Sequence, residues 1–256
     1  WAEMLHDKTR QVYPDKRLFN LTRSGYLGMQ RLRTYPWSGD ISRSFSGLQA
    51  QIPIMLHMSM SGVGYMHSDL GGFTGGHKDP ELYTRWLQLG TFSPVMRAHG
   101  TGVPPEPIYY DQTTQNRVRK AIGMRYDFLP YNYTLAWKYA EKGLPMARPT
   151  NYYHPGLDFL QNINDQYLWG RDLLVAPVIR EGVTSRKVTL PPGKWTGYYS
   201  GTIHQGHNTV TVEAPMNRIP LFIREGGFLV QSAEKLPHPR AYDSDSIRIR
   251  HFLPEE

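Results

Sequence analysis

The pattern of apolar and polar positions divides the chain near residue 145. Before that point, amphipathic stretches with apolar side chains every three or four positions alternate with short apolar runs of strand type. The stretches predict helices over residues 1–13, 45–58, 79–89 and 115–142, and the runs predict strands over residues 17–22, 34–37, 64–68 and 94–97. Strands separated by helices imply parallel pairing with right-handed crossovers. Four such strands are half of an eight-stranded (β/α)8 barrel.

Proline, aspartate and glycine refine the ends of these helices. Asp79 and Pro80 form a typical helix start, because aspartate caps free N–H groups and proline fits the first turn. Pro53 is expected to kink or break the second helix. Pro130 is expected to interrupt the long helix, which closes at Gly143.

The second part of the chain has the pattern of an all-β domain. Turn signals such as Pro191-Pro192-Gly193 separate short β-type runs over residues 173–179, 185–190, 195–199, 209–212, 219–223 and 228–230. These runs predict an antiparallel β-sandwich. A linker and one strand over residues 246–252, stopping at Pro254, follow. The fold class is therefore α/β followed by all-β. The predicted domains are a half barrel (1–144), a β-sandwich (145–236) and the start of a further β domain (237–256).

Composition excludes several classes of protein. The net charge of +7 invites a nucleic-acid interpretation, but the basic residues are scattered and the densest cluster, at 117–120, resembles one solvated helix face. No apolar run is long enough to span a membrane. Cysteine is absent, which leaves the compartment open, with a periplasmic or secreted location slightly favoured. The 17 Tyr and 6 Trp residues suit either sugar stacking or a large core.

Polar side chains follow the predicted strands, where a barrel presents its catalytic groups. Arg23, Asp40, Asp69 and His99 all occupy such positions. Asp40 comes just after Trp37, whose indole would shield the carboxyl group from water and make it a better proton donor. The alternative is that Asp40 only caps the following helix.

Asp69 and the pair Arg97 and His99 have the chemistry of hydroxyl binders. Glycines after Asp69 let a ligand approach closely, and Phe73 offers an apolar wall. Arg97 and His99 lie two positions apart on a strand and therefore face the same side. The plainer alternatives are a turn aspartate and a structural histidine. The histidines lack metal-ligand spacing and no cofactor motif occurs, so no metal or cofactor is expected.

Several separated motifs, in the right order, resemble glycoside hydrolase family 31, the family of α-glucosidases and α-xylosidases. The matching segments are Leu21-Thr22-Arg23-Ser24, Trp37-Ser38-Gly39-Asp40, 64–73, 86–90, 92–99, Leu129-Pro130-Tyr131, Gly143-Leu144-Pro145, Arg148-Pro149 and 173–178. The resemblance implies that Asp40 is the general acid/base of a retaining mechanism. It also implies that the terminal sugar is bound by Arg23, Trp37, Asp69, Phe73, Arg97 and His99.

The sequence departs from the family at one position of importance. The family's nucleophilic aspartate lies in a Trp-x-Asp-x-x-Glu type of segment, which this chain lacks. The expectation is that the chain is the C-terminal part of a longer polypeptide and is inactive alone, its partner being the missing N-terminal part.

The leading hypothesis is therefore a retaining exo-acting α-glucosidase that hydrolyses terminal α-linked sugars of an oligosaccharide or glycoside without a cofactor. α-Galactosidase and α-xylosidase activities are alternatives within the family. A non-catalytic sugar-binding subunit is a rival from another class, and a nucleic-acid binder is a second. Retention of both Asp40 and Asp69 argues against the pure binder.

Overall fold

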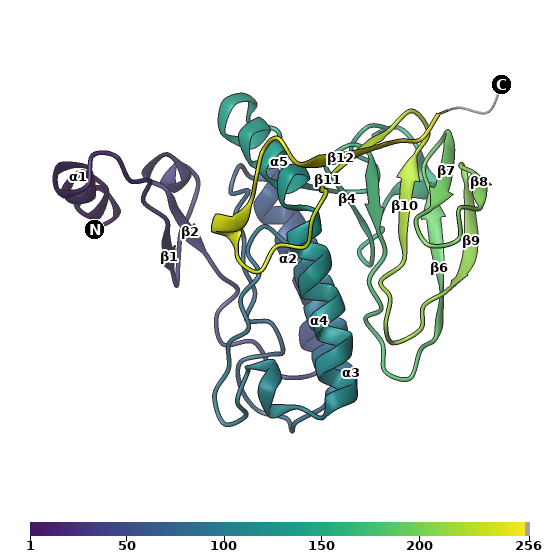
Figure 1. The fold of residues 1–256 in the computed structure, drawn as a ribbon, viewed down its shortest axis with the longest axis horizontal. Helices are drawn as coiled ribbons and strands as arrows, with labels where there is room; N and C mark the ends of the chain where they lie inside the picture. The colour runs from purple at the N-terminus through teal and green to yellow at the C-terminus, as the bar shows by residue number, and fades with distance from the viewer. Residues whose placement is uncertain (254–256) are drawn as a thin grey trace.

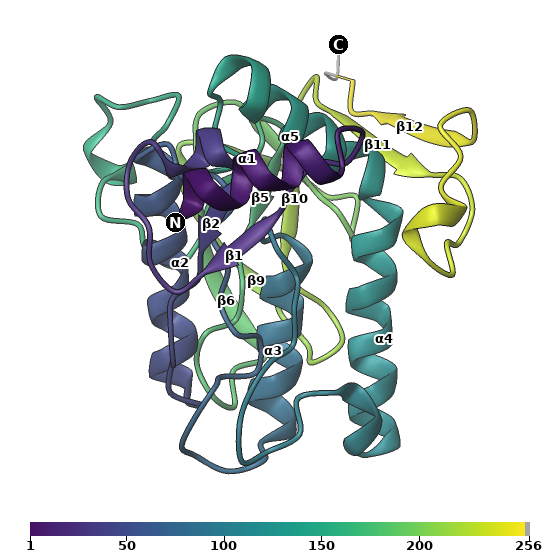
Figure 2. The same ribbon diagram turned by 90° about the vertical axis from the view of Figure 1, so that its left-hand side faces the viewer.

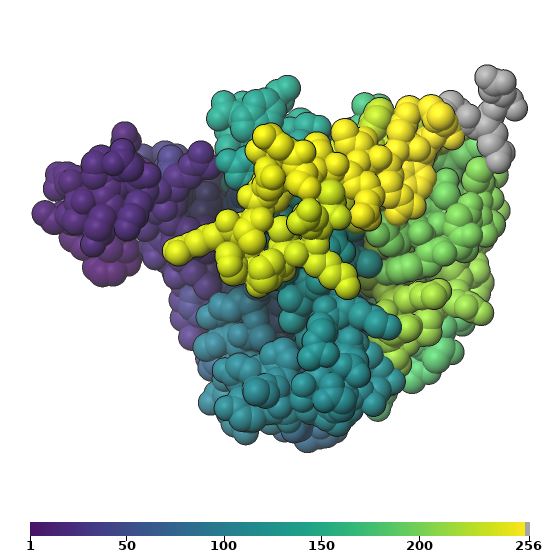
Figure 3. Space-filling model, in the orientation of Figure 1, coloured from purple at the N-terminus to yellow at the C-terminus, as the bar shows by residue number. Residues whose placement is uncertain are grey.

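A computed structural model describes residues 1–253. Figure 1 shows helices α2 to α5 in the middle of the molecule, with the larger β-sheet on one side of them. The α-helices are α1 (Ala2–Val12), α2 (Phe45–Met60), α3 (Pro80–Thr91), α4 (Gln112–Asp127) and α5 (Leu129–Lys142). Helix α1 and the first two strands project from one end, and the space-filling view in Figure 3 shows this projection clearly. The predicted order of helical part first and β part second is confirmed.

Two of the four strands predicted for the first part are formed, and the other two predicted segments are not strands in the structure. Strands β1 (Asn20–Thr22) and β2 (Thr34–Pro36) pair in parallel. The next two segments contribute only isolated parallel bridges, between Trp37 and His67 and between Leu70 and Ala98. The α/β prediction is therefore confirmed, with strands that hold just enough backbone hydrogen bonds to fix their order.

The helix ends agree with the local signals, except at Pro53. The Asp79 carboxylate accepts the N–H groups of Glu81 and Leu82, which satisfies donors that the helix leaves free. Gly143 ends α5 with a φ of 65°, a left-handed conformation that suits glycine. Helices α4 and α5 meet at Phe128, two residues before Pro130, as expected. The expected break at Pro53 is wrong, because α2 continues through it to Met60.

The second part contains a six-stranded antiparallel sheet with strand order β3-β4-β5-β10-β7-β8. Its strands are β3 (Ala147–Arg148), β4 (Tyr167–Trp169), β5 (Leu173–Val175), β10 (Leu221–Arg224), β7 (Lys194–Gly197) and β8 (Ile203–Gln205). A two-stranded ladder of β6 (Ser185–Leu190) and β9 (Asn208–Glu213) accompanies it. The predicted antiparallel β domain is confirmed.

Alternating side chains of the sheet build two cores. In β5, Leu174 packs with Val188 of β6 and Phe222 of β10, in a cluster between the sheet and the ladder. The flanking Leu173 and Val175 belong to the larger cluster that contains the helices. Successive strand residues point to opposite faces, so one strand serves both cores. Figure 2 shows the helices in front of the sheet.

The end of the chain forms a further ladder. Strand β12 (Ile247–His251) pairs antiparallel with β11 (Phe228–Ser232), and Phe252 packs against the larger core. The predicted strand over 246–252 is therefore present, whereas its stop at Pro254 lies outside the described residues. The domain boundaries stay a prediction. Among residues 1–253, no helix combines the length and apolarity needed to cross a bilayer.

Candidate active site

The strand ends that carry the candidate residues are neighbours in space. The Ser38 N–H donates to the His67 carbonyl at 3.0 Å, and the Leu70 N–H donates to the Arg97 carbonyl at 3.2 Å. These bonds link the segment before Asp40 to the segment before Asp69, and that segment to the one before His99. The short parallel strands thus deliver their polar side chains to one edge, as parallel strand ends must.

Asp40 forms an ion pair with Arg23 from the preceding strand end. Arg23 Nη2 donates to Asp40 Oδ2 at 2.9 Å, and the two side chains are 65% and 41% exposed. The hydrogen bond and the charge of Asp40 raise the pKa of the Arg23 guanidinium. This guanidinium lies 6.0 Å from the centre of the Trp37 ring. The Trp37 ring therefore lies beside the guanidinium that pairs with Asp40, and the shielding of Asp40 by the indole stays a prediction.

The capping alternative for Asp40 is wrong. The N-cap of helix α2 is Ser44, whose hydroxyl accepts the N–H of Gly47 at 3.1 Å. Asp40 makes no hydrogen bond to the first turn of that helix within residues 1–253. Its carboxylate is therefore left for Arg23 and for a ligand.

Asp69 occupies a buried and strongly paired site. Arg97 Nη2 donates to Asp69 Oδ1 at 2.5 Å, and the Asp69 side chain is only 1% exposed. A turn does follow, since the Asp69 carbonyl accepts the Gly72 N–H, but the carboxylate faces Arg97. Asp69 Oδ2 has no hydrogen-bond partner among the described residues. A buried oxygen without a partner is costly, which makes it an acceptor for a ligand hydroxyl.

His67 completes this cluster and was not among the candidate site residues. Arg97 Nε donates to His67 Nε2 at 3.1 Å, so we assign the ring proton to Nδ1, which lies 3.4 Å from the Val95 carbonyl. The ring therefore fixes the direction of Arg97. Its signal in the sequence was its place two residues before Asp69 on the same strand face.

Phe73 and His99 form an adjacent wall. Their ring centroids lie 5.5 Å apart with planes inclined at 31°. Arg97 and His99 therefore contact different partners, although they come from one segment. Two further polar atoms near Asp40 are buried without partners in the described part of the chain, namely Trp37 Nε1 and Ser38 Oγ. Ser38 was not predicted as a site residue.

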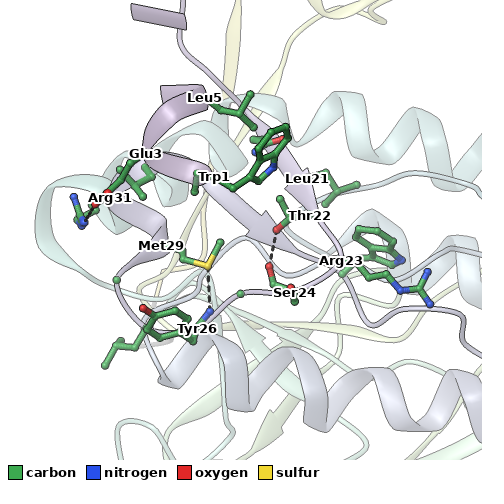
Figure 4. Close-up of a pocket in the computed structure, with 17 residues that line it drawn as sticks. Trp1, Glu3, Leu5, Leu21, Thr22, Arg23, Ser24, Tyr26, Met29 and Arg31 are labelled. Carbon is green, nitrogen blue, oxygen red and sulfur yellow. Dashed lines mark hydrogen bonds and ion pairs between the residues drawn. The ribbon is translucent and has the colours of Figure 1, made fainter. Parts of the chain in front are cut away.

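A cavity of about 1080 Å³ opens beside this edge, between α1, β1 and the segment around Tyr26. Figure 4 shows Trp1, Leu21 and Tyr26 around it, with Arg23 at one margin. Arg23 and Trp37 line both the cavity and the candidate site. Within residues 1–253, no group of three or more acidic or histidine side chains could hold a metal ion.

Comparison with known proteins identifies the family of the chain. The sequence profile for the "Glycosyl hydrolases family 31 TIM-barrel domain" matches residues 1–135, and that for the "Glycosyl hydrolase family 31 C-terminal domain" matches residues 143–229. The chain belongs to glycosyl hydrolase family 31. The resemblance found in the motifs is therefore confirmed, as is a family 31 barrel portion followed by a β-rich domain.

Relatives within family 31 have more than one activity in their names. An α-xylosidase of Saccharolobus solfataricus is 35% identical over 94% of the chain and 35% of the relative. An α-glucosidase of the same organism is 33% identical over 90% of the chain and 36% of the relative. A Flavobacterium johnsoniae dextranase complexed with glucose superposes with a TM-score of 0.92 at 32% identity, covering 100% of the chain and 33% of the dextranase. The chain thus spans about a third of these family 31 proteins.

Proposed function

We propose that this chain carries the acid/base side of the active site of a retaining exo-acting α-glycosidase. In this proposal Asp40 protonates the leaving oxygen and then activates water, as one of two carboxylates does in such enzymes. The observation that carries the proposal is the exposed Arg23–Asp40 pair beside the buried Asp69–Arg97 pair at neighbouring strand ends. One carboxylate remains accessible for proton exchange, and the other is held for binding.

The terminal sugar would lie against the second pair. Asp69 Oδ2 and Ser38 Oγ are free to bond hydroxyl groups, and the Phe73 and His99 rings offer a flat apolar surface. Buried polar atoms that only a substrate satisfies select strongly for that substrate. Arg23 would orient the Asp40 carboxyl group toward the leaving oxygen through its hydrogen bond of 2.9 Å.

The attacking carboxylate would come from the preceding part of the same polypeptide. A retaining mechanism needs a second carboxyl about 5 Å from the first. Asp69 is buried and its Oδ1 is bonded by Arg97, so it is unsuited to attack. Because the chain spans about a third of its relatives, the complete polypeptide is the proper subject of activity measurements.

The leading substrate is a terminal α-glucoside, with α-xylosides and α-galactosides as alternatives. Relatives named α-xylosidase and α-glucosidase are almost equally similar to the chain. Initial rates of the complete protein on aryl α-glucoside, α-xyloside and α-galactoside would decide among them. NMR of the first-formed product should show the α-anomer.

The decisive test replaces Asp40 by asparagine. Asp40→Asn keeps the size of the side chain but removes the transferable proton, so turnover should fall about 10²- to 10⁴-fold. Asp158→Asn is the matched control, because Asp158 is an exposed aspartate of the β domain. Equal activity of Asp40→Asn and the unmodified protein would refute the role of Asp40 as the acid/base. If the unmodified complete protein binds sugar without any turnover, the sugar-binding subunit is supported instead.

A further inference from the structure

Arg43 lies three residues after Asp40 and is almost completely buried, with 7% of the residue exposed. Its guanidinium donates three hydrogen bonds, all to backbone carbonyls. Nη1 bonds the Gly75 carbonyl at 2.6 Å, and Nη2 bonds the Phe73 and Thr101 carbonyls at 3.0 and 2.9 Å. The acceptors belong to the loop after Asp69 and the loop after His99, so one side chain links both.

Backbone hydrogen bonds strengthen the same junction. The Arg43 N–H donates to the Thr74 carbonyl and the Thr101 N–H donates to the Phe73 carbonyl, both at 2.8 Å. The Phe73 N–H donates to the Ile41 carbonyl, also at 2.8 Å. The segment that carries Asp40 and the two loops that carry Phe73 and His99 are therefore fastened around Arg43.

Glycines make room for this residue. A Cβ at Gly72, whose φ is +83°, would lie 2.4 Å from Arg43 Cα, and a Cβ at Gly76 would lie 2.3 Å from the Arg43 carbonyl oxygen. A Cβ at Gly100 would approach Arg43 Nη2 to 3.1 Å. Such close packing fixes the position of Arg43, because displacement in any of these directions meets backbone atoms.

The charge of Arg43 is not paired with a carboxylate in the described part of the chain. A planar guanidinium can bond several acceptors at fixed angles, whereas the ammonium of lysine is a point charge on a flexible stem. The three carbonyls lie where the two terminal nitrogens of a planar guanidinium can bond them together. The residue type is therefore explained by the geometry of the two loops.

We infer that Arg43 is a positioning residue that sets the affinity of the site for the terminal sugar. It holds the Phe73 and His99 rings at their separation of 5.5 Å, where they would face the sugar. Arg43 itself contacts neither of these rings by hydrogen bond and takes no part in proton transfer. This inference rests on the proposed function, since it assumes that the rings face a sugar.

The test compares variants of the complete polypeptide. Arg43→Met should weaken competitive inhibition by the monosaccharide product, and raise KM, about 10- to 100-fold, because small misplacements of binding groups cost that much. The dependence of rate on leaving-group pKa should stay unchanged, in contrast to an Asp40 variant. Arg43→Lys should recover only part of the affinity.

Arg85→Met is the matched control. Arg85 is also buried and also donates to backbone carbonyls, those of Val183, Ala214, Pro215 and Arg218, but these lie in the β domain. Its loss should lower stability without changing sugar affinity. An equal loss of affinity in Arg85→Met, or normal affinity in Arg43→Met, would overturn the inference. If Arg43→Met does not fold, Arg43→Lys decides, because the lysine ammonium keeps the charge but cannot bond the three carbonyls at fixed angles.

Direct binding of the monosaccharide, measured by calorimetry, separates the inference from the proposed function. Unmodified protein that binds sugar without turnover would refute the proposed hydrolysis but leave the inference standing if Arg43→Met binds more weakly. Turnover by the unmodified protein with equal binding by Arg43→Met would refute the inference alone. If the unmodified protein shows no turnover and no sugar binding, both the proposed function and the inference are refuted.

Discussion

Two carboxylates at adjacent strand ends of this molecule have opposite surroundings. Asp40 is 41% exposed and bonds one guanidinium that is itself 65% exposed. Asp69 is 1% exposed and contacts Arg97 at 2.5 Å and His67 at 3.5 Å. Equivalent places in the topology therefore do not give equivalent chemistry. The Asp40 carboxylate is open to solvent in this chain, whereas the Asp69 carboxylate is enclosed and bonded by Arg97.

The segments that carry the two carboxylates are alike away from the strand ends. Tyr35 and Tyr65, which precede Asp40 and Asp69 by five and four positions, lie with ring centroids 4.8 Å apart. Tyr139 of helix α5 packs against Tyr65 with a centroid separation of 5.8 Å. The difference between the carboxylates therefore arises at the strand ends and in the loops that follow them.

The largest expected effect follows removal of the exposed carboxylate. In the complete protein, Asp40→Ala should lower kcat about 10²- to 10⁴-fold on substrates with poor leaving groups, which need a proton. Aryl glycosides with good leaving groups should be cleaved at the first step almost normally. Added azide should accelerate turnover of such substrates by attacking the glycosyl-enzyme in place of activated water, giving the α-glycosyl azide. A uniform loss across all leaving groups would show that Asp40 is not the acid/base.

Replacing the buried carboxylate should affect binding and stability together. Asp69→Asn removes the charge that faces Arg97, so the free energy of unfolding should fall by about 1–3 kcal/mol and KM should rise. This loss of unfolding free energy is smaller than the loss expected for a fully buried ion pair, because the Arg97 side chain is 36% exposed. Asp40→Asn is the comparison and should cost less than about 1 kcal/mol. Denaturant titration of both variants measures how much unfolding free energy each one loses. Equal losses would show that the two carboxylates do not differ in their contribution to stability.

A smaller effect is expected at the partner of Asp40. Arg23→Gln should change the free energy of unfolding by less than about 1 kcal/mol, because exposed ion pairs contribute little. The value of kcat/KM should nevertheless fall about 10-fold, as one charged hydrogen bond to Asp40 is lost. Kinetics and denaturation on the same preparation test this separation. A stability loss as large as that of Asp69→Asn would contradict it.

The smallest effect concerns the shared tyrosine layer at alkaline pH. Burial raises the pKa of Tyr35 from 10.0 to about 12, so this group stabilises the fold fully below pH 10 and loses that contribution as pH rises through 12. Tyr35→Phe should reduce the slope of unfolding free energy against pH in this range by up to about 1.4 kcal/mol per pH unit. Denaturant titrations of the complete protein and the variant at pH 9, 10 and 11 measure it, and an unchanged slope would contradict the burial of Tyr35.

Local patterns predicted most of the fold. Periodicity identified the helices, and Asp79, Pro130 and Gly143 marked their ends because capping and chain reversal depend on neighbouring residues. Pro53 misled the prediction because the surrounding residues Leu48, Ile52 and Leu56 bury an apolar face that keeps the helix intact. The strands predicted over 64–68 and 94–97 are not formed, and only isolated bridges at His67, Leu70 and Ala98 mark these segments.

The sequence predicted members for the candidate site but did not predict the contacts among them. The motifs indicated Arg23, Asp40 and Asp69, and the structure brings Arg23 to Asp40 as neighbours of one strand edge. The position of the Trp37 ring beside the Arg23 guanidinium was not expected from the sequence. The role of Arg43 was not predicted, because its acceptors are backbone carbonyls. Every residue has a backbone carbonyl, so no sequence motif indicates these bonds.

The sequence by itself determined the family, the order of helices before sheets, and the identity of the charged groups at the strand ends, because these depend on residue type and local period. Only the tertiary structure decided which carboxylate is exposed and which is buried, that His67 orients Arg97, and that Arg43 joins two loops. The physical reason is that burial and hydrogen-bond partnership arise here between residues 17 to 58 positions apart in the chain, where a local pattern carries no information.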